Sequence, residues 1–459
     1  MLQDIKKIHF VGIGGAGMSA VARVLIEKGF VVSGSDLQKS PTACQLEKMG
    51  AAIFVGHHQD HIAGVDAVVV STAIPADNQE VVAARKAGIR VFHRADIVAA
   101  LMLESQGIAV AGAHGKTTTT SMIAVMLEQA KLDPTVIIGG EVEYLRGNAK
   151  SGAGKYLVAE ADESDGSFLK FSPQIAVVTN IENDHMDFYK TMDNILHTFK
   201  EFLHKLPQAT GLGILCFDND HVREIAKSLE RKYISYAIDH AADYVARNIR
   251  TQGALTGYDV YRGDQLLGTI RLNVPGRHNV ANSLAAVVVG LSIGLSFQQI
   301  ASGLALFQGA KRRFQTKAHL NGVWIVDDYA HHPTEIIATL QAARQTEPKR
   351  LICVFQPHRY SRTKLLRQEF GKAFSPADLL ILTDVYSAGE APIPGVSGET
   401  IKEEVENQTN KKVIYISDKE KIARYLSEIV EPGDLVMTMG AGNIYQTGEK
   451  LVEILVQQQ

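Results

Sequence analysis

Short apolar runs recur along the chain, and most of them end in glycine or in polar residues. Runs of this length between turn residues are typical of buried strands, and the longer segments that separate them favour helices. The expected strands are residues 8–11, 30–33, 67–70, 89–92, 108–111, 156–159, 175–179, 324–326, 351–355, 379–382 and 435–439. The expected helices include 18–28, 122–127, 283–290 and 334–343. This alternation predicts an α/β fold whose ligands bind beyond the carboxyl ends of parallel strands.

The first expected strand leads into a glycine-rich turn, Gly12-Ile13-Gly14-Gly15-Ala16-Gly17, and the second strand ends at Asp36. A G-x-G-x-x-G turn before a helix, with an acidic residue about 20 positions later, is the fingerprint of a nucleotide diphosphate on a helix N-terminus. The pattern does not identify the nucleotide. The alternative is a strand-to-helix turn without a ligand.

A second turn, Gly112-Ala113-His114-Gly115-Lys116-Thr117-Thr118, lies between the run 108–111 and the apolar segment 122–127. Backbone amides in such a turn close around phosphate oxygens, the lysine bridges the outer phosphates, and the Thr117 hydroxyl reaches Mg²⁺. Val110 stands where a full phosphate-loop motif has its first glycine. The strand before the turn and the helix after it favour a nucleoside triphosphate site over a plain turn.

Acidic residues follow the next two expected strands. Glu160-Ala161-Asp162-Glu163-Ser164-Asp165 comes after residues 156–159, and the segment from Asn180 to Asp187, which includes His185, comes after 175–179. Carboxylate oxygens near a phosphate loop suit Mg²⁺, which prefers oxygen ligands. A solvated acidic loop and a structural histidine are the alternatives.

Other strand ends also carry polar residues. Ser71 and Thr72 open a turn that runs to Pro75 and is expected to cap a helix, and His93 and Arg94 follow residues 89–92. Such positions bind ligands in parallel sheets, although His93 and Arg94 also fit an ordinary surface loop. The later polar groups are Pro275 to Asn282, Lys311 to Arg313, Asp327 to Pro333, Gln356 to Arg362, Thr383 to Tyr386 and Gly440 to Asn443.

The length of 459 residues favours about three domains, and we expect them to be residues 1–105, 106–313 and 314–459. A net charge of −3 argues against a strongly basic surface, so nucleic acid is not an expected partner. Three scattered cysteines fit a reducing compartment better than a disulfide framework. No signal-peptide pattern and no apolar run of about 20 residues occurs, so we expect a cytoplasmic protein without a membrane partner.

Three α/β units with these motifs in this order resemble the Mur ligases of bacterial cell-wall synthesis, over essentially the whole chain. The resemblance rests on Gly12 to Ser19, His114 to Thr120, Glu160 to Asp165, Asn180 to Asp187, Asp327 to Pro333 and Phe355 to Arg362. It is strongest to the branch of the family that adds L-alanine. It implies an N-terminal Rossmann-like domain that binds UDP, a central P-loop ATPase-like domain, and a C-terminal Rossmann-like domain that binds the amino acid.

The resemblance implies an ATP-dependent ligase, using Mg²⁺, that joins L-alanine to the lactyl carboxylate of UDP-N-acetylmuramate through an acyl phosphate, as a monomer or homodimer. The implied UDP-sugar site comprises Gly12, Gly14, Gly15, Ala16, Gly17, Asp36, Ser71, Thr72, His93 and Arg94. The implied ATP site comprises Gly112, Ala113, His114, Gly115, Lys116, Thr117, Thr118, His278, Asn279, Asn282, Arg313, Asp327 and Asp328. The implied amino-acid site is Tyr329, His331, Arg359 and Arg362, the catalytic residues are Lys116, His331 and Arg359, and the metal ligands are Thr117, Glu160 and His185.

One position differs from the family pattern, and the role of a second one has to be inferred. Ala113 stands where the family more often has threonine, and Lys200 lies near the position of a carbamylated lysine in sister ligases. We expect Lys200 to be a surface helix residue. Three alternative functions remain: a ligase that adds a preformed peptide to the same UDP sugar, an NAD-dependent oxidoreductase, and a nucleotide-gated binding protein. The oxidoreductase leaves Gly115-Lys116-Thr117 and the acidic strand ends unexplained, and the binding protein leaves the loops Asp327 to Pro333 and His358 to Arg362 without a role.

Overall fold

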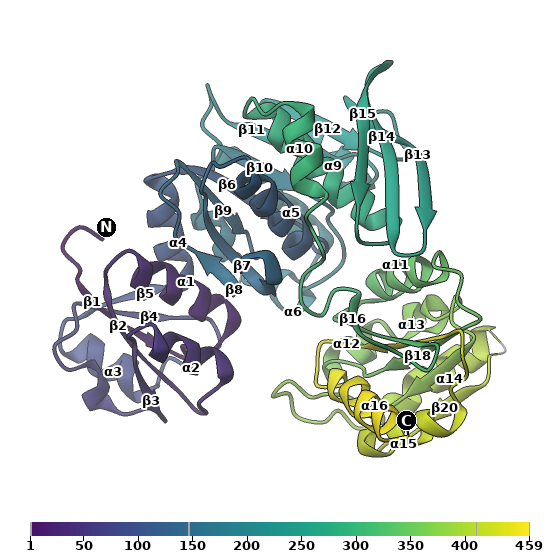
Figure 1. Ribbon diagram of the computed structural model, residues 1–459. Coiled ribbons are helices and arrows are strands. Elements are labelled where there is room, and N and C mark those ends of the chain that lie inside the picture. The colour runs from purple at the N-terminus through teal and green to yellow at the C-terminus, as the bar shows by residue number, and fades with distance from the viewer. Residues whose placement is uncertain (1, 146, 410, 459) are drawn as a thin grey trace. The chain divides into compact units, whose positions relative to one another are not determined.

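The computed structural model of the chain describes residues 2–145, 147–409 and 411–458. It contains three β-sheets flanked by helices, which confirms the expected α/β fold with three sheet-containing parts (Figure 1). Contacts between residues divide the chain into two compact units. The larger unit runs to Asn248 and includes Tyr258–Arg271 and Ala281–Gln308, and the smaller unit comprises Ile249–Gly257, Leu272–Val280 and the chain from Gly309 onward.

The first sheet has five parallel strands in the order β3-β2-β1-β4-β5. Its elements are β1 (Lys7–Val11), α1 (Ala16–Glu27), β2 (Val31–Asp36), α2 (Pro41–Lys48), β3 (Ala52–Val55), η1 (Gln59–Ile62), β4 (Ala67–Val70), α3 (Gln79–Lys86), β5 (Arg90–His93) and α4 (Arg94–Leu103). The strand order reverses at β1, which lies between β2 and β4. Such a reversal places a ligand crevice at the carboxyl ends of these strands, where the first glycine-rich turn and Ser71 lie.

The expected helix cap in residues 71–75 is wrong. The helix α3 begins later, at Gln79, and its cap is Asn78, whose side-chain oxygen accepts hydrogen bonds from the amides of Glu80 and Val81. An asparagine side chain satisfies the free amides of a first helical turn, which fixes where the helix begins. Ser71 and Thr72 therefore lie in a turn and do not belong to a helix start.

The second sheet has ten strands in the order β15-β14-β13-β12-β11-β10-β6-β9-β7-β8. Its strands are β6 (Gln106–Ala111), β7 (Thr135–Val142), β8 (Gly147–Lys150), β9 (Tyr156–Glu160), β10 (Ile175–Val178), β11 (Leu212–Cys216), β12 (Tyr233–Ala237), β13 (Tyr244–Gln252), β14 (Leu255–Arg262) and β15 (Gln265–Leu272). The accompanying helices are α5 (Lys116–Gln129), η2 (Glu143–Leu145), η3 (Ser167–Lys170), α6 (Met186–Tyr189), α7 (Met192–His204), α8 (Asp220–Ala226), α9 (Arg277–Ser292) and α10 (Phe297–Leu304). Strand β6 pairs in parallel with both β9 and β10. The acidic loops after β9 and β10 consequently flank the loop after β6.

One hydrophobic core joins the first and second sheets. Helix α1 packs against β7 and β8, and a single cluster of buried side chains extends from Ile8 in β1 to Ala109 in β6 and Val178 in β10. Separating the two sheets would expose this apolar surface to water, at a cost of about 25 cal/mol per Å². The core therefore holds the loops of both sheets within one compact unit.

The third sheet has the order β16-β17-β21-β18-β19-β20, with β16 antiparallel to β17 and the other pairs parallel. Its elements are β16 (Gln315–Leu320), β17 (Val323–Asp328), α11 (Pro333–Arg344), β18 (Arg350–Phe355), α12 (Tyr360–Leu365), α13 (Arg367–Ala373), β19 (Leu379–Leu382), α14 (Gly398–Thr409), β20 (Val413–Tyr415), α15 (Lys419–Ile429), β21 (Asp434–Met439) and α16 (Tyr445–Gln457). Met439 lies opposite both Asp328 and Phe355, so three polar loops leave the sheet at one edge. Within the described ranges, no helix has the length and apolar character needed to cross a membrane.

A buried carboxylate links the strands of the first sheet to α3. Glu80 accepts hydrogen bonds from Ser35 Oγ at 2.6 Å, His57 Nδ1 at 2.9 Å and His61 Nδ1 at 2.7 Å, and His9 Nε2 lies 3.5 Å away. Burial alone would raise the pKa of Glu80, but these hydrogen bonds outweigh it and lower the pKa to about 2. The ionised carboxylate is therefore the form that stabilises this part of the fold.

We predict that Glu80→Gln lowers the free energy of unfolding by about 2 kcal/mol at pH 7, because buried donors lose a charged acceptor. The unfolded carboxyl takes up its proton near pH 4.5, whereas the folded one stays ionised down to about pH 2. The stabilisation is thus fully present above pH 4.5 and is lost as the pH falls toward 2. Urea unfolding at pH 7 and pH 3.5 measures it, and the deficit of the variant should be smaller at pH 3.5.

The matched control is Glu47→Gln, because Glu47 forms an exposed ion pair with Lys39 at 2.7 Å. Exposed pairs contribute little, so this variant should unfold like the wild type at both pH values. An equal deficit of Glu80→Gln at pH 7 and pH 3.5 would contradict the assignment of the effect to the ionised carboxylate.

Candidate active site

The phosphate loop between β6 and α5 has no room for side chains at its two glycines. Gly112 has φ +138° and Gly115 has φ +82°, both in the region that favours glycine. A Cβ at position 112 would lie 2.1 Å from Thr179 Oγ1, and one at position 115 would lie 2.5 Å from Asn282 Oδ1. The loop is therefore packed closely against the end of β10 and against α9.

Side chains at the end of β10 hold the phosphate loop in shape. Asn180 Oδ1 accepts a hydrogen bond from the His114 amide at 2.9 Å, and Asn180 Nδ2 donates to the His114 carbonyl oxygen at 3.0 Å. Thr179 Oγ1 donates to the same carbonyl oxygen at 2.6 Å. The His114 ring in turn lies 3.2 Å from Glu182 Oε2. These bonds fix the loop through its backbone, and the Ala113 amide adds one more by donating to the Asn180 carbonyl oxygen at 3.3 Å.

Lys116 lies at the start of α5 with its ammonium directed back over the loop. Nζ donates to the Gly112 carbonyl oxygen at 2.6 Å and to Glu163 Oε1 at 2.9 Å. Burial alone would lower the pKa of Lys116, but the carboxylates of Glu163, Asp162 and Glu160 outweigh it and raise the pKa above its usual value. The cation at this helix N-terminus is suited to bind the terminal phosphates of a nucleotide.

The loop after β9 presents two buried carboxylates beside Lys116. Burial raises the pKa of both Glu160 and Glu163, and a hydrogen bond from Thr117 opposes the shift at Glu160. Among the described residues, Glu160 Oε1 and Glu163 Oε2 are buried atoms without a hydrogen-bond partner. His185, which has φ +55°, places Nε2 3.7 Å from Glu163 Oε1.

Unpaired buried carboxylate oxygens next to a phosphate loop are the donor set that a hard divalent cation requires. The residues present therefore fit Mg²⁺ at Glu160 and Thr117, with His185 beside Glu163. The sequence expectation omitted Glu163, although this residue contacts both Lys116 and His185. The sequence could have indicated Glu163, because this residue lies in the acidic run 160–165 that directly follows a strand.

The first glycine-rich turn forms a loop between β1 and α1. Gly12 has φ +78°, and Asp36 at the end of β2 accepts a hydrogen bond from the Gly14 amide at 2.9 Å. A Cβ at position 17 would lie 2.4 Å from Arg94 Nη1, so Arg94 lies against the first turn of α1. Asp36 therefore braces the glycine-rich loop, which includes Gly15 and Ala16, through the Gly14 amide.

The ends of β4 and β5 bring Ser71, Thr72, His93 and Arg94 to one edge of the first sheet, since Val70 and His93 are paired in register. The Ser71 carbonyl oxygen accepts a hydrogen bond from the Ile74 amide. The His93 side chain caps α4, and burial lowers its pKa. The edge therefore carries a hydroxyl, an imidazole and a guanidinium that suit an anionic ligand.

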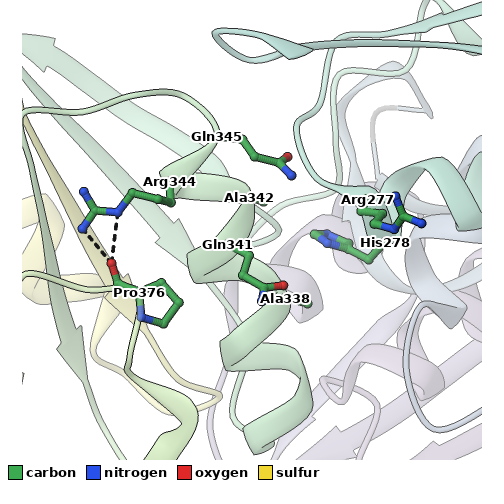
Figure 2. Close-up of a pocket in the computed structure, with 8 residues that line it drawn as sticks. All are labelled: Arg277, His278, Ala338, Gln341, Ala342, Arg344, Gln345 and Pro376. Carbon is green, nitrogen blue, oxygen red and sulfur yellow. Dashed lines mark hydrogen bonds between the residues drawn. The ribbon is translucent and has the colours of Figure 1, made fainter. Parts of the chain in front are cut away.

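The three residues expected near adenine all belong to α9 and have different neighbours. Asn282 lies against Gly115 of the phosphate loop, and Asn279 Nδ2 donates to the Pro275 carbonyl oxygen at 2.7 Å. Burial lowers the pKa of His278 to about 4, with a further contribution from Arg313. His278 lines a pocket of about 360 Å³ with Arg277, Ala338, Gln341, Ala342, Arg344, Gln345 and Pro376 (Figure 2).

The aspartates after β17 are buried and paired. Asp327 accepts hydrogen bonds from Arg312 Nε at 3.0 Å and from Thr438 Oγ1 at 2.8 Å. Asp328 accepts hydrogen bonds from the backbone amides of Phe314 and Ala330. Burial raises the pKa of Asp328 to about 6. These carboxylates hold the loops of the third sheet in place.

Two neighbouring arginines have different environments, and the resemblance implied a role in the ATP site for Arg313 alone. Arg312 donates to Asp327 and to the carbonyl oxygens of Gly440 and Gly442. The Arg313 guanidinium lies 5.3 Å from the Tyr329 ring centre and 3.5 Å from Glu335. Arg312 thus joins β17 to the loop after β21, a role that spacing alone does not reveal.

The loop after β17 also carries His331. His331 Nδ1 lies 3.0 Å from the Tyr329 carbonyl oxygen, which can only accept, so the proton is on Nδ1 and the lone pair is on Nε2. Burial lowers the pKa of His331 to about 3. The imidazole is therefore neutral at pH 7, the form that accepts a proton, although so low a pKa makes it a weak base.

The loop after β18 meets His331 through His358, whose ring centre lies 5.7 Å away. Arg362 Nη1 donates to His358 Nδ1 at 3.3 Å. Arg359 has φ +70°, and its amide donates to the Tyr386 carbonyl oxygen at 2.8 Å. A non-glycine residue in this region is strained, and such strain is concentrated at functional sites. Two guanidinium groups and an imidazole near one edge suit a small carboxylate.

Lys200 lies apart from these clusters. It belongs to α7, and Nζ donates to Ser228 Oγ at 2.9 Å in an exposed position. This placement agrees with the expectation of a surface helix residue.

Three family models match the chain in sequence order. They are the Mur ligase family catalytic domain over residues 7–106, the Mur ligase middle domain over 110–290, and the Mur ligase glutamate ligase domain over 312–442. Among curated proteins, the UDP-N-acetylmuramate–L-alanine ligase of Pelotomaculum thermopropionicum is 50% identical over 455 residues, covering 99% of this chain and 98% of its own length. The protein of the same name from Geotalea uraniireducens is 49% identical over 455 residues, covering 99% of both chains.

Solved structures give the same result. The crystal structure of the UDP-N-acetylmuramate–alanine ligase from Thermotoga maritima matches with a TM-score of 0.85 at 29% identity, covering 99% of this chain and 100% of that one. A murein peptide ligase from Psychrobacter arcticus matches with a TM-score of 0.71 at 26% identity, covering 98% of each chain. The chain belongs to the Mur ligase family, because family models match all three of its parts and curated relatives are 49–50% identical along nearly its whole length.

Proposed function

We propose that the chain is an ATP-dependent ligase that joins L-alanine to the lactyl carboxylate of UDP-N-acetylmuramate, a step of peptidoglycan precursor synthesis. The observation that carries the proposal is the phosphate loop in which Lys116 meets Glu163, beside the unpaired buried oxygen of Glu160. The names of the curated relatives at 49–50% identity support this choice of substrates.

In this proposal ATP binds at the phosphate loop. Lys116 contacts the terminal phosphates, the loop amides surround them, and Asn282 packs on the loop from α9. His278 and Asn279 are assigned to the adenine side and Arg313 to the side of the third sheet. There Asp328 accepts a hydrogen bond from the Phe314 amide and Asp327 one from Arg312, so both aspartates act by holding the loop that carries Arg313. Thr117, Glu160 and His185 would hold Mg²⁺, which supplies positive charge that stabilises the phosphates during transfer.

The UDP sugar is assigned to the carboxyl edge of the first sheet. The diphosphate would lie on the loop from Gly12 to Gly17, which Asp36 braces through the Gly14 amide. Ser71, Thr72, His93 and Arg94 would contact the remaining polar groups of the sugar nucleotide. L-alanine is assigned to Arg359, Arg362, His331 and Tyr329, because a guanidinium fork binds a carboxylate through two parallel hydrogen bonds.

The chemistry follows from charge. A carboxylate is a poor electrophile, so its oxygen first attacks the γ-phosphorus of ATP, and ADP leaves. Lys116 offsets the charge that develops on the transferred group. The neutral amine of L-alanine then attacks the acyl carbon, an amide forms, and phosphate leaves. The Nε2 atom of His331 is proposed to accept the amine proton, and Arg359 to orient the amino acid.

The finer organisation is also proposed. We propose domain boundaries near residues 105 and 313, and the ranges of the three family models support them. A cytoplasmic location is proposed, and the protein is proposed to act as a monomer or homodimer. The alternative acceptor is a preformed peptide, for which the 26% identical murein peptide ligase is the relevant relative.

We predict that phosphate release from ATP requires both UDP-N-acetylmuramate and L-alanine, and that Lys116→Ala reduces it roughly 100-fold or more, as expected when a group that stabilises transferred charge is removed. Lys200→Ala is the matched control, because this lysine bonds only an exposed serine hydroxyl among the contacts that the structure provides. A tripeptide in place of L-alanine tests the alternative acceptor. Full activity of Lys116→Ala would contradict the assignment of the phosphate loop.

We predict that Glu160→Gln raises the Mg²⁺ concentration needed for half-maximal activity at least about 10-fold, because the amide removes an anionic ligand. A magnesium titration of phosphate release measures the change. The control is Glu201→Gln on α7, whose carboxylate is half exposed near His197. An unchanged titration curve for Glu160→Gln would place the cation elsewhere.

We predict that Arg362→Lys raises the KM for L-alanine roughly 10-fold and leaves the KM for ATP unchanged, because lysine keeps the charge but loses the planar fork. Steady-state kinetics with each substrate varied in turn separate the two constants. The control is Arg367→Lys, whose guanidinium pairs with Glu404 on α14. A rise in the KM for ATP instead would assign Arg362 to the nucleotide.

A further inference from the structure

The loop between β9 and η3 directs its acidic side chains to two different places. Glu163 turns to the phosphate loop, where it pairs with Lys116. Asp165, two residues later, turns to the first sheet. Its Oδ2 atom accepts a hydrogen bond from the Thr72 hydroxyl and lies 3.7 Å from His93 Nε2. One short loop therefore touches both proposed nucleotide sites.

Both carboxylate oxygens of Asp165 make contacts. The Ser167 amide donates to Oδ1 at 2.9 Å, while Oδ2 faces Thr72 and His93. Its side chain is 15% exposed, so water competes weakly for these contacts. Because Val70 and His93 are paired in register, the carboxylate bridges the ends of two adjacent strands, β4 and β5.

A second link runs parallel to the first. Arg94 Nη2 lies 3.7 Å from Asp162 Oδ2, and the same guanidinium lies against Gly17 at the start of α1. The glycine-rich loop of the first sheet is thereby connected to the acidic loop of the second sheet. Asp162 also acts on Lys116: burial alone would raise the pKa of this aspartate, but the charges of Lys116 and Arg94 outweigh it and lower the pKa, so Asp162 lies between the two sites.

We infer that Asp165 is a positioning residue of the ligase: by holding Thr72 and His93 it fixes the UDP-sugar site to the loop that carries Glu160 and Glu163, so that the two nucleotides bind cooperatively. The inference rests on the proposed function, because it takes the ends of β4 and β5 as the UDP-sugar site. A ligand that orders a shared loop lowers the cost of ordering it for the second ligand.

The reaction gives a reason for such a link. The lactyl carboxylate must approach the γ-phosphorus to about 3–3.5 Å, and a misplacement of about 1 Å can cost roughly 100-fold in rate. The two substrates are held by different sheets, so their relative position depends on the contacts that join those sheets. Asp165 makes its contact at the strand ends themselves, where the substrate is proposed to bind.

The main variant is Asp165→Ala, with Asp165→Asn as the conservative variant, because asparagine keeps an oxygen for the Thr72 hydroxyl and loses the charge facing His93. We expect Asp165→Ala to lower kcat/KM for UDP-N-acetylmuramate roughly 10- to 100-fold, with Asp165→Asn between it and the wild type. Because coupling between two sites is reciprocal, the KM for ATP measured at saturating UDP sugar should rise as well. Calorimetric titration of the UDP sugar, with and without a non-hydrolysable ATP analogue, should show cooperative binding in the wild type and none in Asp165→Ala.

Lys170→Gln is the matched control. Lys170 Nζ pairs with Asp96 Oδ1 at 2.7 Å, which joins η3 to α4 across the same two sheets. The other oxygen of Asp96 accepts a hydrogen bond from the His93 amide at 2.8 Å, so this variant changes a neighbouring contact between the sheets and leaves the bond between Asp165 and Thr72 in place. This variant should keep the wild-type kinetics and the cooperativity. An equal loss in Lys170→Gln would mean that any contact between the sheets has this effect, and it would overturn the specific role of Asp165.

Thr72→Val tests the same contact if the Asp165 variants fail to fold, since it removes only the hydroxyl that donates to Asp165. If Asp165 acts through Thr72, then Thr72→Val also loses cooperativity, and combining it with Asp165→Ala adds little further loss. Retained cooperativity in either Asp165→Ala or Thr72→Val overturns the inference. Wild-type enzyme that releases no phosphate with both substrates would instead contradict the proposed function, while the calorimetric titration would still test the coupling.

Discussion

The close packing of the phosphate loop against the end of β10 is the constraint on which the rest of the site depends. Two glycines without space for a Cβ, and hydrogen bonds from Thr179 and Asn180 to the backbone of His114, fix the start of α5. That position places the Lys116 ammonium between the loop and Glu163. Because the strands β9 and β10 flank β6, the acidic loops that complete the site follow from the sheet order alone.

Carboxylates serve several different purposes around this centre, and burial and hydrogen bonding distinguish them. Glu80 is surrounded by donors, which lower its pKa and make it a structural anion. Glu160 and Glu163 have raised pKa values through burial and each has an unpaired oxygen among the described residues, as expected of groups that bind a cation. Asp327 and Asp328 are buried but fully engaged with backbone amides, Arg312 and Thr438, so they shape loops.

The sequence predicted the strands that lead into the polar loops, and it predicted the phosphate loop, because both depend on local patterns. Apolar runs that end in glycine or acid identify β6, β9 and β10, and the turn before Lys116 is a motif of adjacent residues. It did not predict β3, β7, β8, β11 to β16 or β20. It also placed a helix cap too early, because Asn78 was not recognised as the cap. The contacts of Glu163, Asp165 and Arg312 join residues far apart in sequence, and only the fold brings them together.

The central claim is that the lactyl carboxylate attacks ATP and is activated as an acyl phosphate. An oxygen-isotope label placed in that carboxylate tests it most directly, because the oxygen that bonds to phosphorus leaves with the phosphate when the amine attacks the acyl carbon. The account predicts that the released phosphate carries one labelled oxygen and that the UDP sugar gains one alanyl residue. Unlabelled phosphate, released in step with the same product, would contradict it.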